Sequence, residues 1–156
     1  MSVIKPFRFW HWFALGFGSG LAPKAPGTFG TIAALPIVAI AAYTLPPVVY
    51  ATLGVVLFAL GIYASDITSR DFRAVDPGYI VIDEWAGLWF SLIALPFSWP
   101  LLLLAFVLFR AFDILKPWPV SWADKKLTGG LGVMADDVIA GGLTCVCLHG
   151  LLWWWR

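Results

Sequence analysis

Charged residues are scarce in this chain of 156 residues, which has ten lysines and arginines and nine aspartates and glutamates. They make up 12% of the sequence, against roughly 25% in soluble domains. Apolar residues make up 61%, with ten tryptophans and twelve phenylalanines, and the mean hydropathy is +0.87. This composition is typical of a membrane protein. The net charge of +1 produces no field that would attract nucleic acid, so no nucleic-acid partner is expected.

Cysteine and histidine are equally rare, with two of each. Cys145 and Cys147 both lie in the last apolar run, where we expect small core residues rather than a disulfide or a metal site. His11 and His149 lie in aromatic or apolar surroundings, so core or interfacial roles are expected for both. No cleavable signal peptide is evident, and the length predicts a single membrane-embedded domain over residues 1–156.

Apolar runs separated by proline, glycine and polar residues predict an all-α fold, a polytopic membrane bundle of about five helices. The aromatic segment 7–17 suits an N-terminal interfacial or re-entrant helix. A first loop, rich in glycine and proline, follows over 18–30. The core helices, within residues 31–155, are expected at 31–45, 48–64, 82–95, 101–115 and 136–155. Several of these are shorter than the roughly 20 residues needed to cross a bilayer upright.

The positions of the basic residues predict the orientation of this bundle. The connections 18–30, 65–84 and 113–137 contain six lysines and arginines, whereas the connections 45–47 and 96–100 contain no charge. Successive helices place the first three connections on one side of the membrane. Because lysine and arginine accumulate on the cytoplasmic side, we expect this side to face the cytoplasm.

Acidic residues also gather at the ends of the apolar runs. Carboxylates near membrane depth are costly unless they have a partner or a function, and their oxygens suit Mg²⁺ or Mn²⁺. We therefore predict a cage for a hard cation. The alternative is that these acids only cap helix N-termini. The residues concerned are Asp76, Asp83, Glu84, Asp113, Asp136 and Asp137.

Basic and small polar groups are predicted to lie on the same side. Arg110 stands three residues before Asp113, on one helical face, where it forms a simple ion pair or binds two oxygens of a phosphate. Lys116 lies just beyond. In the first loop, Ser19, Lys24 and Thr28 adjoin a helix start, which favours anions.

Carboxylates, a cation and an anion site together predict phosphoryl transfer, in which a metal polarises the phosphoryl group and basic groups neutralise developing charge. The sequence has no cysteine followed five residues later by arginine and no Asp-x-Asp pair, which argues against cysteine and aspartyl nucleophiles. A metal-ion or anion transporter is the alternative from another class. It would need polar groups on both sides of the membrane, and the far side has only Thr44, Ser98 and Arg156. A non-catalytic assembly factor would not explain the acids.

Four segments resemble the bacterial phosphatidylglycerophosphatase A family over about residues 12–142. They are GFGSGLAPKAPGTFGT (16–31), VIDEWAGLW (81–89), FRAFDILKPWP (109–119) and GGLGVMADDVIAG (129–141). The resemblance implies an all-helical, Mg²⁺-dependent enzyme of the bacterial inner membrane. Such an enzyme removes the terminal phosphate of phosphatidylglycerophosphate and leaves phosphatidylglycerol, so its partner is a phospholipid in the bilayer.

Matched by motif, the family's functional positions fall on residues of this chain in four groups. Asp83 and Glu84 match its Asp-Glu pair, and Asp136 and Asp137 match its Asp-Asp pair. The Arg-x-x-Asp motif falls on Arg110 and Asp113, and the Lys-Pro-Trp-Pro motif begins at Lys116. The first-loop motif falls on Ser19, Pro26, Gly27 and Thr28. Two further acids of the family fall on Asp71 and Asp76.

We therefore predict three overlapping sets of site residues. The metal ligands are Asp83, Glu84, Asp136 and Asp137. The catalytic residues are Asp83, Glu84, Arg110, Asp113 and Asp137. The substrate-binding residues are Ser19, Lys24, Thr28, Arg110 and Lys116. The division of the carboxylates between metal ligand and base stays open at this point.

Overall fold

The computed structural model describes residues 8–75 and 77–156, and every regular element within them is helical, as the composition predicts. The chain forms seven α-helices and one short 3₁₀ helix over these residues. They are α1 (Phe9–Ala14), η1 (Ser19–Leu21), α2 (Pro26–Thr44), α3 (Pro47–Asp71), α4 (Ile82–Ser91), α5 (Trp99–Leu115), α6 (Val120–Lys126) and α7 (Gly129–Trp155).

Three helices, α2, α3 and α7, are long and apolar enough to cross a membrane. The prediction of about five apolar helices is therefore too high as a count of membrane-spanning helices, although the helical class is confirmed. The ten residues of α4 and the 17 of α5 fall short of the roughly 20 that an upright crossing needs. The outer faces of the three long helices are apolar: Ile40, Val55 and Val146 are 65%, 59% and 70% exposed. Such surfaces fit contact with lipid.

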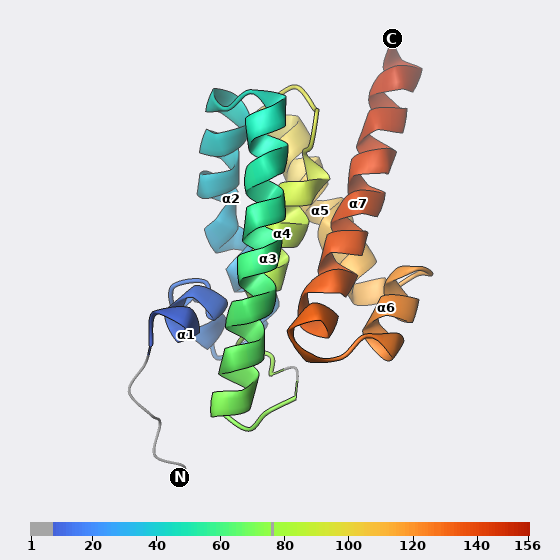
Figure 1. The fold of residues 1–156 in the computed structure, drawn as a ribbon. Coiled ribbons are helices and arrows are strands. Elements are labelled where there is room, and N and C mark those ends of the chain that lie inside the picture. Colours follow the sequence, from blue (N-terminus) through green and yellow to red (C-terminus); the bar gives the residue numbers. More distant parts are fainter. Residues whose placement is uncertain (1–7, 76) are drawn as a thin grey trace.

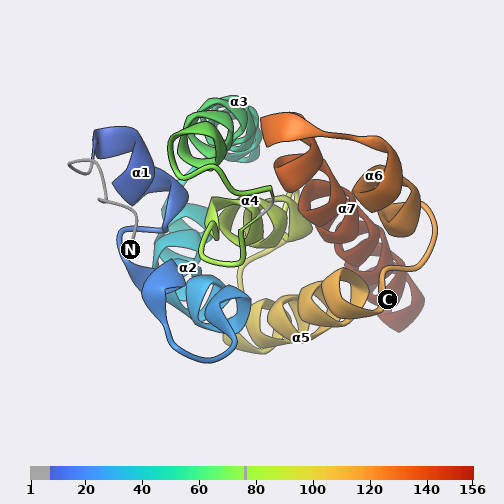
Figure 2. The same ribbon diagram turned by 90° about the horizontal axis from the view of Figure 1, so that it is seen from below.

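Helix α4 lies at the centre of the bundle, with α2, α3, α5 and α7 around it (Figure 2). Every residue of α4 except Phe90 is buried. A reciprocal pair of hydrogen bonds joins α4 to α3: the Tyr50 hydroxyl donates to the Trp89 carbonyl at 2.7 Å, and the Trp89 indole donates to the Tyr50 carbonyl at 2.9 Å. A ten-residue helix is thus held in place by tertiary contacts rather than by its own propensity.

The connections that carry the basic residues all lie at one end of the bundle, as the sequence predicts. Helix α1, helix α6 and the linking residues 72–75, 77–81 and 116–119 lie at the lower end in Figure 1, whereas the turns at 45–46 and 92–98 lie at the upper end. This arrangement follows from the antiparallel order of successive helices.

Several helix boundaries differ from those expected. Helix α2 begins at Pro26 rather than residue 31, because proline is favoured at the first position of a helix. Helix α3 continues to Asp71. Helix α7 begins at Gly129 and has no acidic residue in its first turn. The interpretation of Asp136 and Asp137 as N-terminal caps is therefore wrong, because both lie about two turns inside α7.

Candidate active site

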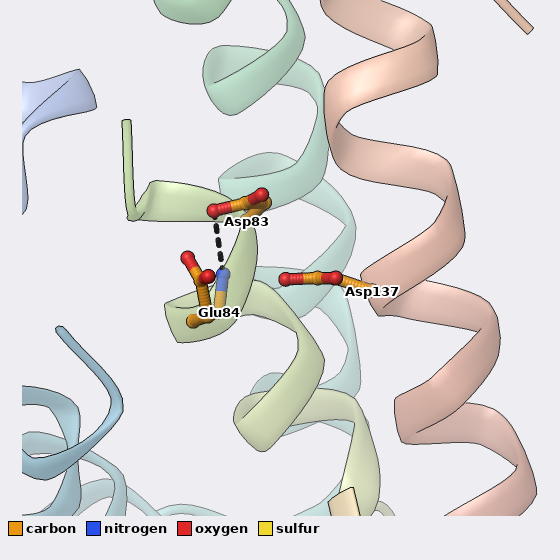
Figure 3. A group of neighbouring side chains, drawn as sticks. All are labelled: Asp83, Glu84 and Asp137. Carbon is orange, nitrogen blue, oxygen red and sulfur yellow. Dashed lines mark hydrogen bonds between the residues drawn. The ribbon is translucent and has the colours of Figure 1, made fainter. Parts of the chain in front are cut away.

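The central helix presents two acids at its start. Asp83 and Glu84 are only 8% and 9% exposed, and the Glu84 backbone N–H donates to Asp83 Oδ1 at 2.9 Å. Asp137 faces them from α7 (Figure 3). One carboxylate oxygen from each of these three residues lies within 4.8 Å of the others. This spacing is short enough for one cation to contact all three.

A second group of three acids shares Asp137 with the first. Asp113 at the end of α5 and Asp136 on α7 each offer an oxygen within 4.8 Å of Asp137 and of each other. Three helices thus bring five carboxylates into one group, which we call the carboxylate cluster. Its members are Asp83, Glu84, Asp113, Asp136 and Asp137.

Two glycines allow α4 and α7 to come this close. A Cβ on Gly141 would overlap the Gly87 carbonyl oxygen, and a Cβ on Gly87 would lie 2.8 Å from the Asp137 carbonyl oxygen. Gly87 lies one helical turn after Asp83 in α4, and Gly141 lies one helical turn after Asp137 in α7. Close backbone contact through glycine therefore sets the separation of Asp83 and Asp137.

The environment disfavours negative charge on these acids unless a cation is present. Burial raises the pKa of Asp83 well above its ordinary value, and the charges of Glu84 and Asp137 raise it further; burial also raises the pKa of Glu84. Within residues 8–75 and 77–156, Glu84 Oε2, Asp136 Oδ1 and Asp137 Oδ2 are buried and have no hydrogen-bond partner. Unpartnered, hard carboxylate oxygens are the donors that a divalent cation such as Mg²⁺ requires.

Arg110 lies at the edge of the cluster on α5. Its guanidinium forms an ion pair with Asp113, and its Nη1 lies 3.9 Å from Glu84 Oε1. Its Nη2 lies 3.5 Å from the Thr28 hydroxyl, while its Nε is buried and has no partner in the described chain. The intrahelical ion pair therefore exists, but it leaves guanidinium donors for another oxygen-rich group.

Lys116 approaches the cluster from the end of α5. Its ammonium lies 2.9 Å from Asp136 Oδ2 and 3.4 Å from Asp124 Oδ1. Burial alone would lower the pKa of this ammonium, but its hydrogen bond to Asp136 and the two neighbouring carboxylates raise the pKa above its ordinary value. Lys116 therefore remains a cation at physiological pH. The sequence interpretation missed Asp124; the signal was an acid on the short helix that directly follows the Lys-Pro-Trp-Pro motif.

Only part of the first loop lies near the carboxylate cluster. A Cβ on Gly27 would lie 2.7 Å from Glu84 Oε1 and 3.4 Å from the Arg110 nitrogens, so the start of α2 reaches the cluster, with Thr28 beside it. Ser19 instead donates to the Gly16 carbonyl at 2.9 Å within its own turn. Lys24 is exposed and forms no ion pair within the described residues. The structure thus brings Thr28 into contact with Arg110 at the edge of the cluster, but not Ser19 or Lys24.

Other polar residues named from the sequence lie elsewhere. Asp71 pairs with the fully buried His11 at 3.0 Å, which joins α1 to the end of α3. The exposed His149 and the partly buried Cys145 both approach the Ile93 carbonyl oxygen, so they link α7 to the segment that follows α4. Asp76 lies outside the described residues.

Known proteins resemble this chain over nearly its whole length. The family model for phosphatidylglycerophosphatase A matches residues 12–152. Phosphatidylglycerophosphatase A of Escherichia coli (strain K12) is 40% identical over 149 residues, which cover 95% of this chain and 86% of that protein. The Haemophilus influenzae protein of the same name is 39% identical over 155 residues, covering 99% and 93%. A Bacteroides thetaiotaomicron protein, named as a candidate phosphatidylinositol-3-phosphatase, is 40% identical over 147 residues, covering 88% and 90%. No solved structure matches the chain significantly.

Proposed function

The chain belongs to the phosphatidylglycerophosphatase A family, and from this premise we propose that it hydrolyses phosphatidylglycerophosphate to phosphatidylglycerol and phosphate. This reaction is a phosphoric monoester hydrolysis, and it serves phospholipid biosynthesis. The observation that carries the proposal is the cluster of five carboxylates, four of them buried, with Arg110 and the start of α2 at its edge. Nothing in the comparisons favours the alternative of a transporter.

Mg²⁺ is the cofactor that we propose for this site. Asp83, Glu84, Asp136 and Asp137 would supply its ligands. Glu84, Asp136 and Asp137 each have a buried oxygen without a partner among the described residues, Asp83 shares one group of three acids with Glu84 and Asp137, and Asp136 shares the second group with Asp113 and Asp137. A divalent cation bound there supplies Lewis acidity that polarises the phosphoryl group and lowers the pKa of water. The donor set contains only oxygen, which suits Mg²⁺ or Mn²⁺ better than softer metals.

The residues of the chain have separate tasks in this proposal. The Arg110 guanidinium binds two oxygens of the terminal phosphate, since its planar donors match that geometry. Thr28 and the backbone N–H groups at the start of α2 add further donors. Lys116 neutralises charge beside Asp136. The net reaction adds water across one P–O bond: a carboxylate of the cluster accepts a proton from water, and the glycerol oxygen that leaves phosphorus takes up a proton.

The location of the site fits a lipid substrate. The protein is a membrane protein. Its carboxylate cluster comes from the start of α4, the end of α5 and a point two turns inside α7, and the links that precede α4 and follow α5 lie at the end of the bundle with the basic connections (Figure 1). We propose that this end faces the cytoplasm, because the lysine and arginine excess lies there. We also propose that the membrane is the bacterial inner membrane, as the resemblance to the family implies. The acyl chains of the substrate would then remain in the bilayer while its headgroup reaches Arg110.

Phosphate release in detergent micelles tests this function. Purified protein would be given phosphatidylglycerophosphate with Mg²⁺, with EDTA, and with EDTA followed by excess Mg²⁺. We expect hydrolysis that requires the metal and returns on its addition. Phosphatidylinositol 3-phosphate serves as the second substrate, because one relative is named for it. Preferential hydrolysis of the inositol lipid would overturn the substrate assignment, and no hydrolysis of either lipid by folded, Mg²⁺-loaded protein would overturn the function.

A further inference from the structure

A cleft lies apart from the carboxylate cluster, between the end of α3 and the start of α7. Its volume is about 730 Å³, and none of the five cluster carboxylates lines it. The end of α3 and the residues after it contribute Ser69, Arg70 and Arg73. Lys125 of α6 and Thr128 also line the cleft, and so do two acids, Asp66 and Asp124.

The cleft carries an excess of positive charge. Arg70 pairs with Asp66 of the same wall at 2.8 Å. Asp124, which also lines the cleft, is in contact with the Lys116 ammonium at 3.4 Å. Within residues 8–75 and 77–156, Arg73 and Lys125 form no ion pair. These two cations are therefore available to an anionic ligand.

The start of α7 also favours an anion. Helix α7 has 27 residues; its N-cap, Thr128, makes no side-chain capping hydrogen bond, and its first turn contains no acid. The first N–H groups of this long helix thus favour a negative group in the cleft that Thr128 and Gly129 line.

The level of the cleft in the membrane identifies the type of anion. Helices α3 and α7 are both long and apolar enough to span a bilayer, and the cleft forms where α3 ends at Asp71 and α7 begins at Gly129. The ends of spanning helices lie at the level of lipid headgroups. The wall also includes Val75, which is 99% exposed, and an exposed apolar residue at this level fits the interface rather than bulk water.

We propose that this cleft binds the phosphodiester headgroup of an acidic glycerophospholipid, at a site separate from the catalytic one. Arg73 and Lys125 would contact the phosphate, with the N–H groups at the start of α7 as additional donors. The proposal goes beyond the catalytic function and does not depend on it.

The test is equilibrium binding of dioctanoyl phosphatidylglycerol to the full chain in detergent, with EDTA and an Arg110→Gln background to weaken binding at the catalytic site. Thr128→Asp places a negative charge in the cleft while supplying a good N-cap, so the helix keeps its start. We expect it to weaken binding at least tenfold relative to Thr128→Asn, which has the same shape without the charge. Arg73→Gln with Lys125→Gln should have a similar effect, whereas Lys126→Gln, outside the cleft, should not.

Two other ligands identify the source of the anion. Dioctanoyl phosphatidylcholine, which has no net charge, should bind at least tenfold more weakly than phosphatidylglycerol. Inorganic phosphate that displaces the lipid at equal concentration would show a site for soluble anions and overturn the proposal. Equal affinities of Thr128→Asp and Thr128→Asn would also overturn it, while leaving lipid hydrolysis unaffected. Conversely, a chain that binds in the cleft but hydrolyses no lipid would refute the catalytic function alone.

Discussion

Gly141 of α7 lies directly against the backbone of Gly87 in α4, where a Cβ on Gly141 would overlap the Gly87 carbonyl oxygen. Gly141→Ala should therefore push the two helices apart and separate Asp137 from Asp83. Because backbone atoms cannot rotate away as a side chain does, we expect a loss of about 1–3 kcal/mol in the free energy of unfolding. The rate of phosphate release should fall by more than the fraction of protein that this loss of stability would unfold. Thermal unfolding and phosphate release on the same sample measure both effects.

Gly142→Ala is the matched control for this change. It lies next to Gly141 on the same helix, but nothing lies within 4 Å of a Cβ added there. Alanine also favours helix over glycine by up to about 1 kcal/mol, so this variant should be as stable as the natural protein or slightly more stable. Equal activities of the two variants would show that the glycine contact does not set the site geometry.

Arg110→Lys distinguishes an ion-pair role from a phosphate-binding role. If Arg110 only pairs with Asp113, a lysine that keeps the charge should have a mild effect. If the guanidinium binds the transferring phosphate, its loss should cost about 2–4 kcal/mol, or about 30- to 1,000-fold in rate. The loss should appear mainly in kcat, measured in lipid–detergent micelles. Asp113→Asn should not compensate for it, and an Arg110→Lys rate within about threefold of the natural protein would favour the ion-pair role.

Asparagine substitutions test the carboxylate cluster. Asp83→Asn, Asp136→Asn and Asp137→Asn keep the size of each side chain and remove a charged oxygen. We expect at least two of the three to lose nearly all activity, because a divalent cation prefers charged oxygen ligands. The metal-free variants should stay folded and unfold at the same or a higher temperature, since each removes a charge that is costly to bury. Natural rates and Mg²⁺ dependence in all three would refute the metal site.

The stability of the metal-free protein should depend on pH in a defined direction. The folded-state pKa values of Asp83 and Glu84 lie above their ordinary values, which are near 4. Between the ordinary and the raised pKa, the folded protein holds protons that the unfolded chain has lost, so stability falls as pH rises through this window. In EDTA, the unfolding temperature should therefore be lower at pH 8 than at pH 5. Added Mg²⁺ should raise the unfolding temperature more at pH 8 than at pH 5. An equal increase at the two pH values would contradict the proposed protonation of Asp83 and Glu84.

Labelling of single cysteines tests the orientation of the bundle. In a Cys145→Ala, Cys147→Ala background, Lys126→Cys should react with a membrane-impermeant thiol reagent only from the cytoplasmic side. Ser98→Cys, at the start of α5 and the opposite end of the bundle, should react only from the other side. Reaction of Ser98→Cys from the cytoplasmic side would reverse the proposed orientation.

Much of this molecule could be predicted from its sequence, because composition, the repeat of apolar residues and short motifs are properties of the local sequence. Few charges in an apolar chain identify a membrane protein, the repeat of apolar residues identifies helices, and alternating connections place the basic residues at one end. Acids such as Asp83 and Asp137 stand out because carboxylates in apolar surroundings need a partner. Motif order was sufficient to predict the family, which the comparisons confirm.

Tertiary structure alone decided which of these residues meet. Ser19 and Thr28 belong to one motif, yet only Thr28 approaches Arg110, because the Ser19 hydroxyl is used within its own turn. Asp124 contacts Lys116 although no motif marked it. The start of α7 at Gly129 places Asp136 inside the helix and so excludes the alternative that this acid only caps the helix N-terminus. Local sequence preference fixes the type of a segment, but the distance between two carboxylates depends on how closely helices pack, and here that depends on the contact of Gly87 with Gly141.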